Sequence, residues 1–149
     1  MSSLPAAVLD ILLVEDDPGD ELLTREALED QGAAHRVHVA HDGQEALDFL
    51  YRLSDRANAP HPDLIILDLN LPKFSGHQVL ERIKADPDLA QIPVVILSTS
   101  QAQEDIADSY RLGANAYVSK PVDLDRYTRV VQQIDEFFAG LAQLPPHAL

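Results

Sequence analysis

The chain has 149 residues, 46% of them hydrophobic, and a formal net charge of -14 at pH 7. This length suits one domain with its own core and leaves no room for a second. The negative charge argues against a nucleic-acid partner, because such backbones are bound through lysine and arginine, and the lack of cysteine excludes disulfides and thiolate chemistry. The N-terminal apolar stretch is interrupted by Asp10 and ends in acids, so we expect a cytoplasmic protein without a signal peptide or membrane contact.

Short runs of valine, isoleucine and leucine alternate along the chain with longer segments of helical character. Nearly unbroken apolar runs of this kind are typical of parallel strands that are buried on both faces. We expect strands at about 9–14, 35–40, 63–67, 92–97 and 116–119, and helices at about 17–31, 43–54, 75–85, 102–112 and 123–139. Five strand and helix repeats with right-handed crossovers predict an α/β fold with a doubly wound, five-stranded parallel sheet.

Polar side chains follow four of the five expected strands, at the point where each strand ends. They are, in chain order, the acidic cluster Glu15-Asp16-Asp17, then Asp68, Ser98 and Lys120. Ligands of parallel sheets lie outside the carboxyl ends of the strands, so these side chains should gather at one edge. Repulsion among the four carboxylates must then be relieved by protonation or by a cation.

Each residue type at this edge suits the transfer of a phosphoryl group to a carboxylate. Asp68 would attack in line, while Mg²⁺, or Mn²⁺ in its place, and Lys120 would neutralise the transferring oxygens. Ser98 would donate its hydroxyl to one of these oxygens. A lone aspartate in a loop commonly forms a turn or a cap, and a lone lysine is commonly solvated. The joint presence of all four types favours a site over these alternatives.

The expected metal ligands are few, because Mg²⁺ retains several of its waters. Asp16 and Asp68 would bind directly, Glu15 would bind through water, and Asn70 would contribute its backbone carbonyl. Asp17 is assigned to the cap of the first helix instead, since Pro18 follows it directly.

With these residues the chain resembles the receiver domains of two-component response regulators. The resemblance covers about 9–139 and rests on five motifs: Val14-Glu-Asp16, Leu67-Asp68, Asp68-Leu-Asn-Leu-Pro72-Lys-Phe-Ser-Gly76, Leu97-Ser98 and Tyr117-Val-Ser-Lys120-Pro121. It implies a flavodoxin-like receiver fold with five helices at 9–139, an N-terminal lead-in at 1–8 and a C-terminal extension at 140–149. Two positions depart from the commonest pattern, with glutamate at 15 in place of aspartate and serine at 98 in place of threonine.

The resemblance also implies roles for individual residues. Asp68 would accept a phosphoryl group from a phosphohistidine of a sensor histidine kinase, with Glu15 and Asp16 binding Mg²⁺ and Lys120 pairing with the phosphate. Ser98 and Tyr117 would act as the switch pair, and the Lys120–Pro121 bond would be cis. Such a protein is a phosphoacceptor rather than a turnover enzyme, with self-assisted phosphoryl transfer and autodephosphorylation as its only chemistry.

Looser features narrow the resemblance to single-domain regulators that partner phytochrome-type sensor kinases. These features are the long loop at 54–62, the strand end Leu97-Ser-Thr-Ser100 and the apolar C-terminal tail. A chain without a DNA-binding segment would pass its signal to a downstream protein target or to a phosphotransfer protein.

Three other interpretations fit the residues less well. A haloacid-dehalogenase-like phosphatase also uses a strand-end aspartate, Mg²⁺ and lysine, but needs a second acid two residues later, where this chain has Asn70. A binding module that works without phosphorylation would not require the residues of the site. His35, His38 and His41 alternate across a strand, so they cannot converge on a metal ion.

The last helix carries more apolar residues than one buried face requires. Its main stripe is Leu124, Tyr127, Val131, Ile134 and Phe138, with Val130, Phe137 and Leu141 beside it. A single broad core face is the simpler explanation. Because two adjacent phenylalanines are rarely both buried in the core beneath such a helix, we expect a homodimer contact through this helix and the tail.

Overall fold

The computed structural model describes residues 8–29, 35–54 and 61–146, and it contains a parallel sheet with helices on both faces. The strands are β1 (Asp10–Val14), β2 (Arg36–Ala40), β3 (Leu64–Leu67), β4 (Val94–Ser98) and β5 (Ala116–Ser119). The helices are α1 (Pro18–Glu29), α2 (Gly43–Ser54), α3 (Gly76–Ala85), α4 (Gln103–Arg111) and α5 (Leu124–Asp135). The strand order is β2-β1-β3-β4-β5, so the expected fold class is confirmed.

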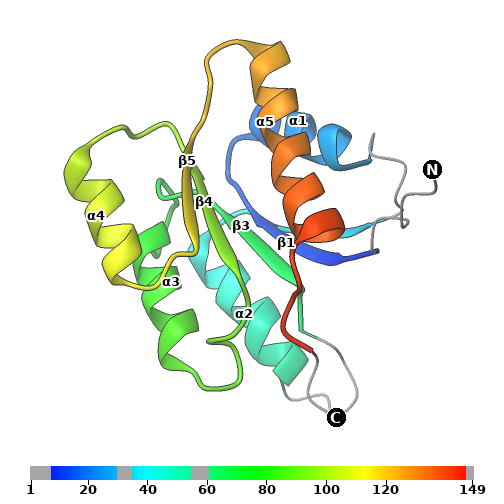
Figure 1. The fold of residues 1–149 in the computed structure, drawn as a ribbon. Coiled ribbons are helices and arrows are strands. Elements are labelled where there is room, and N and C mark those ends of the chain that lie inside the picture. Colours follow the sequence, from blue (N-terminus) through cyan, green and yellow to red (C-terminus); the bar gives the residue numbers. More distant parts are fainter. Residues whose placement is uncertain (1–7, 30–34, 55–60, 147–149) are drawn as a thin grey trace.

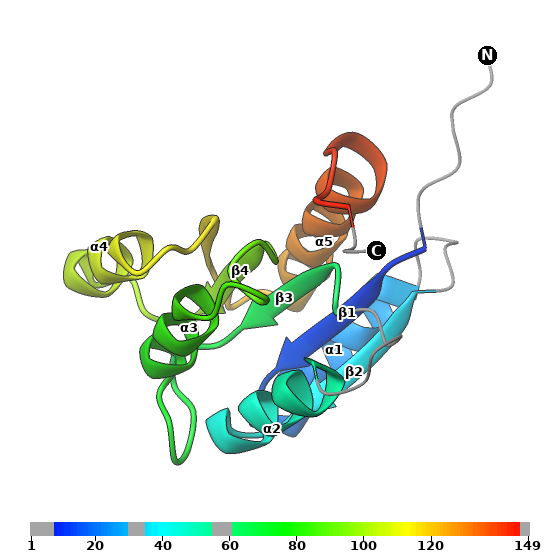
Figure 2. The ribbon, with the colours of Figure 1, turned by 90° about the horizontal axis from the view of Figure 1, so that it is seen from below.

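The two faces of the sheet are covered by different helices, as Figures 1 and 2 show. Helices α1 and α5 pack together on one face, and α2, α3 and α4 cover the other. Alternate residues of each central strand therefore enter different cores: Leu12 and Ile65 belong to the core under α2 and α3, while Ile11 and Ile66 belong to the core under α1 and α5. Burial on both faces explains why β3 and β4 read as unbroken apolar runs.

The end of the chain differs from the expected single helix at 123–139. Helix α5 stops at Asp135 and continues as the π-helix η1 (Glu136–Leu141). The described tail continues beyond η1, and Leu144 packs against the core under α1 and α5. The tail thus reaches the amino edge of the sheet, where β3 and β4 begin (Figure 1). Among the described helices, none has the length and apolar character needed to cross a lipid bilayer.

The strand order places a crevice at the carboxyl edge between β1 and β3. The chain crosses from β1 to β2 in one direction and returns to β3 on the other side, so the connections diverge there. Ligands of doubly wound sheets bind at such a switch point. Pairing of Val14 with Leu67 brings the residues that follow these two strands to the same level.

Candidate functional site

The side chain of Lys120 is the centre of a buried ionic cluster at this crevice. Its Nζ atom lies 2.6 Å from Glu15 Oε1, 2.8 Å from Asp68 Oδ2 and 2.9 Å from Asp20 Oδ2. The Lys120 side chain is only 4% exposed, and Glu15 and Asp68 are similarly buried. An ammonium group has three N–H donors, so these three carboxylates occupy all of them.

Glu15, Asp68 and Lys120 therefore gather as expected, and the structure adds Asp20 to them. Asp20 lies in the first turn of α1, five residues after Glu15, and half-buried. Sequence reasoning missed this residue, because an acid in the first turn of a helix is already explained by the helix dipole. The one sequence feature that points to Asp20 is its position shortly after the strand-end acids Glu15, Asp16 and Asp17.

Burial and neighbouring charges shift the pKa values of Glu15 and Lys120 in opposite directions. Burial raises the pKa of the Glu15 carboxyl to about 7, because lost hydration outweighs its hydrogen bond with Lys120. Burial alone would lower the pKa of Lys120, but hydrogen bonds to Asp68, Glu15 and Asp20 raise it above its ordinary value. Lys120 is therefore a permanent cation, and the carboxylates around it outnumber it.

The remaining negative charge fits a divalent cation. Carboxylate oxygens of Glu15, Asp16 and Asp68 all lie within 4.8 Å of one another, and Asp16 is exposed to solvent. Hard oxygen ligands with one open side match Mg²⁺ or Mn²⁺, which keep waters in their coordination shell. Asp17 is turned away to α1, where its Oδ1 accepts the N–H of Gly19 at 2.8 Å and that of Asp20 at 3.2 Å. The expected cap is thereby confirmed.

The turn after Asp68 is shaped by the start of α3. The Asn70 N–H donates to Asp68 Oδ1 at 3.1 Å, and Gly76 N–H donates to Leu69 O at 2.9 Å. A Cβ atom at Gly76 would collide with the backbone oxygen of Asp68. Glycine is thus required where the helix begins against the turn, which explains its place in the sequence motif.

Ser98 and Tyr117 meet through the loop that connects β4 to α4. The buried Ser98 Oγ accepts the N–H of Ser100 at 3.3 Å, and the Tyr117 hydroxyl donates to the Ser100 carbonyl at 2.8 Å. The Ser100 hydroxyl donates in turn to Asp105 in the first turn of α4. The two residues expected to form the switch pair therefore contact one short segment.

One expected feature of the site is wrong. None of the described peptide bonds is cis, so the bond between Lys120 and Pro121 is trans. The trans form is the lower-energy state of such a bond by about 0.5–1 kcal/mol, and the Lys120 side chain reaches all three carboxylates with this geometry.

The three histidines near β2 contact carboxylates of different elements. His35 contacts Asp135 at 2.7 Å, His38 contacts Asp10 at 3.3 Å and His41 contacts Glu21 at 3.0 Å. Each imidazole therefore has its own carboxylate, and the three carboxylates belong to different elements.

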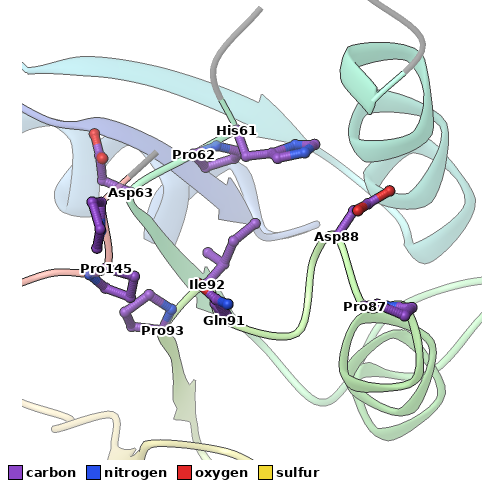
Figure 3. Close-up of a pocket in the computed structure, with 10 residues that line it drawn as sticks. His61, Pro62, Asp63, Pro87, Asp88, Gln91, Ile92, Pro93 and Pro145 are labelled. Atoms are coloured by element: carbon purple, nitrogen blue, oxygen red, sulfur yellow. The ribbon is translucent and has the colours of Figure 1, made fainter. Parts of the chain in front are cut away.

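A hollow of about 410 Å³ lies at the opposite, amino edge of the sheet (Figure 3). It is formed by the segments that precede β3 and β4 and by the tail, including His61, Asp88 and Pro145. The Nδ1 atom of His61 is buried without a hydrogen-bond partner. The hollow is separated from the carboxylate cluster by the length of the strands, so it forms no part of that site.

Comparisons with known proteins agree with this geometry. The family model described as "Response regulator receiver domain" matches residues 11–132. Response regulator Rcp1 of Synechocystis sp. is 42% identical over 135 residues, which cover 91% of this chain and 92% of Rcp1. The probable methanogenesis regulatory protein FilR2 of Methanothrix harundinacea is 38% identical over 135 residues, which cover 91% of this chain and 86% of FilR2.

Two solved structures have the same fold. The phosphorylated cyanobacterial phytochrome response regulator RcpA superimposes with a TM-score of 0.88 at 46% identity, covering 94% of this chain and all of RcpA. The Mn²⁺-bound form of Rcp1 superimposes with a TM-score of 0.85 at 41% identity, covering 95% of this chain and all of Rcp1. A divalent metal ion in Rcp1 agrees with the chemistry of the Glu15, Asp16 and Asp68 cluster.

Proposed function

This chain belongs to the response regulator receiver family, and on that premise we propose that Asp68 is the residue that accepts the phosphoryl group. The observation that carries this assignment is the position of the Asp68 carboxylate, 2.8 Å from the Lys120 ammonium and beside Glu15 and Asp16. Members of the family act in signalling rather than as turnover enzymes.

The chemistry assigned to the site is an in-line transfer from a phosphohistidine. A carboxylate oxygen of Asp68 forms a bond to phosphorus while the bond between phosphorus and the imidazole nitrogen breaks, and the imidazole keeps the electron pair. Lys120 stabilises the charge on the transferring oxygens. A Mg²⁺ or Mn²⁺ ion held by Glu15, Asp16, Asp68 and the Asn70 carbonyl would supply further charge stabilisation when bound.

We also propose that the phosphoryl group on Asp68 is lost by hydrolysis at the same site. Water would attack the phosphorus of the aspartyl phosphate, releasing inorganic phosphate and restoring the carboxylate. This autodephosphorylation is the only turnover we propose. The phosphatase alternative is not favoured, because the residue two positions after Asp68 is Asn70, which cannot act as a general acid.

The partner that donates the phosphoryl group is a sensor histidine kinase, and we assign it to the phytochrome type. Support comes from RcpA, a phytochrome response regulator that is 46% identical to this chain. FilR2, a probable methanogenesis regulatory protein, is 38% identical to this chain. The kinase assay should therefore include sensor kinases that respond to stimuli other than light. A sensor histidine kinase takes its phosphoryl group from ATP. Because ATP is found in the cytoplasm, we propose that the reaction takes place there.

The switch is assigned to Ser98, Tyr117 and the loop between them. A phosphoryl group adds strong acceptor oxygens, and the Ser98 hydroxyl is the nearest donor on β4. Movement of Ser98 would shift Ser100, to which Tyr117 is already hydrogen-bonded. Ser98→Ala should therefore accept phosphate at Asp68 but transmit the signal poorly to a downstream target or phosphotransfer protein. A defect in phosphorylation alone would contradict the switch assignment.

A homodimer through α5 and the tail is also part of the proposal. Val122, Leu124, Phe137 and Leu141 are exposed, and Phe137 is 49% exposed beside Phe138. A hollow of about 270 Å³ with mostly apolar walls lies between β5 and α5. An apolar surface of this kind on a soluble receiver favours a protein contact. We place the receiver unit at 9–139, with 140–149 as the extension that contributes to this contact.

Incubation with candidate sensor kinases and labelled ATP tests the proposed function. Transfer of label from a phytochrome-type kinase to wild-type protein, but not to Asp68→Asn, is the expected result. Transfer only from kinases of another type would keep the phosphoacceptor and overturn the phytochrome assignment. Binding of a target with equal affinity before and after labelling would favour a module that works without phosphorylation.

A further inference from the structure

We propose that Asp20 is a positioning residue that competes with the phosphoryl group for Lys120 and thereby sets how readily Asp68 is modified. This inference rests on the proposed role of Asp68. Lys120 has three N–H donors, and Asp20, Glu15 and Asp68 accept all three in the unmodified protein. A phosphoryl group on Asp68 can be bound by Lys120 only if one of these contacts is given up.

Asp20 differs from the other two carboxylates in its relation to the metal cluster. Glu15 and Asp68 belong to the group of oxygens within 4.8 Å of one another, and Asp20 does not. A bound divalent cation would therefore share Glu15 and Asp68 with Lys120 and weaken their hold on the ammonium. Asp20 would keep its full charge for Lys120, so it becomes the main competitor of the phosphoryl oxygens.

The backbone of Asp20 is held in place by α1. Its N–H donates to Asp17 Oδ1 at 3.2 Å, and its carbonyl accepts the hydroxyl of Thr24 at 2.8 Å. Thr24 is buried and is itself bound to the Tyr127 hydroxyl of α5 at 3.0 Å. Because this backbone is fixed, the Asp20 carboxylate can follow the Lys120 ammonium only by rotation of its own side chain. We therefore expect the contact between Lys120 and Asp20 to weaken when Lys120 turns to a phosphoryl group.

The test uses beryllofluoride, a mimic of the phosphoryl group, with saturating Mg²⁺. Asp20→Asn keeps the shape of the side chain but replaces a charged acceptor by a neutral one, which binds an ammonium less strongly. We expect this variant to bind beryllofluoride about three- to tenfold more tightly than wild type, as measured by calorimetry. Asp20→Glu restores the charge and should return the affinity toward the wild-type value.

Glu21→Gln is the matched control. Glu21 lies in the same first turn of α1 and carries the same charge, but its carboxylate contacts His41 and Arg25 rather than Lys120. Both variants remove one negative charge from the first turn of α1, and only Asp20→Asn also removes a contact to Lys120. Urea unfolding of both variants checks that each retains its fold.

The outcomes separate this inference from the proposed function. An equal gain in Asp20→Asn and Glu21→Gln, or weaker binding in Asp20→Asn, would overturn the competition while leaving Asp68 as the phosphoacceptor. Tighter binding in Asp20→Asn that Asp20→Glu does not reverse would also overturn it. If wild-type protein with Mg²⁺ bound no beryllofluoride at all, the proposed function and the inference would both be wrong.

Discussion

Two buried polar clusters lie at opposite edges of the sheet, and they differ in how their hydrogen-bonding groups are shared. At the amino edge, His35 Nδ1 accepts the N–H of Leu9 at 2.9 Å, so the ring proton lies on Nε2 and is donated to Asp135 at 2.7 Å. Both side chains are almost fully buried. At the carboxyl edge, the single cation Lys120 is shared among three carboxylates.

The difference separates a structural pair from a functional cluster. Each ring nitrogen of His35 has one partner, so this pair needs no further group. The Lys120 cluster remains too negative, which leaves a place for a metal ion and for the charge changes of phosphorylation. The His35–Asp135 pair joins the residue before β2 to α5 with fixed partners, whereas the Lys120 cluster can change its partners.

Breaking the His35–Asp135 pair should give the largest loss of stability. Asp135→Ala leaves the buried Nε2–H of His35 without an acceptor and should lower the free energy of unfolding by about 3 kcal/mol. Urea unfolding measures this loss. His41→Ala is the control, because its contact with Glu21 is 55% exposed on the histidine side and should contribute at most about 1 kcal/mol. Similar losses in the two variants would mean that the buried pair is not the structural contact described above.

The Lys120 cluster should respond to metal instead. At a Mg²⁺ concentration about 100 times its dissociation constant, the wild-type protein should gain about 2.7 kcal/mol of stability. Asp16→Asn should lose most of this gain, because it removes a ligand. Asp17→Asn should keep the gain although it weakens the α1 cap. Thermal unfolding with and without Mg²⁺ distinguishes the two, and equal losses would place Asp17 among the ligands.

The metal-free cluster should also depend on pH. The pKa of Glu15 is raised to about 7 in the folded protein, so the folded state holds a proton that the unfolded chain has already lost at pH 6. Stability from this group is fully present below its unfolded pKa and is lost as the pH rises through about 7. Between pH 6 and 8 the loss should be about 1 kcal/mol.

Comparison of wild type with Glu15→Gln in the presence of a chelator isolates this effect, because other groups titrate equally in both. The difference in unfolding free energy between the two proteins should depend less on pH when Mg²⁺ is added. The cation favours the ionised carboxylate, so Glu15 would then be ionised over the whole range. A difference that does not change with pH would show that Glu15 is ionised throughout this range.

The smallest expected effect concerns the loop between the two switch residues. Tyr117→Phe removes one hydrogen bond, to the Ser100 carbonyl, and should cost about 1 kcal/mol. Addition of beryllofluoride should also change amide hydrogen exchange in α4 (Gln103–Arg111) less in this variant than in the wild type. An unchanged response would remove Tyr117 from the switch.

The fold and most of the site were predictable because they depend on local patterns. Burial on both faces produces the unbroken apolar runs at Leu64–Leu67 and at 94–97, and the strand ends then place Glu15, Asp68 and Lys120 at one edge. The contacts that escaped prediction join distant segments. Asp20 meets Lys120 across 100 residues, and His35 meets Asp135 across the same separation.

Two further features could not be read from the sequence for physical reasons. The lysine and proline at 120 and 121 permit either isomer at small cost, so their identity alone does not decide the trans bond observed here. The change from α5 to η1 at Glu136 follows no helix-breaking residue, since the next glycine is Gly140, so no local sequence signal marks it.

Mass spectrometry after treatment with a small phosphodonor and Mg²⁺ tests the central assignment most directly. The wild-type protein should gain one phosphoryl group, and fragmentation should place it on Asp68. Asp68→Asn, in which Lys120 keeps its contacts with Glu15 and Asp20, should gain none. A phosphoryl group on Asp68→Asn, or on another carboxylate of the wild-type cluster, would contradict the assignment of Asp68 as the phosphoacceptor.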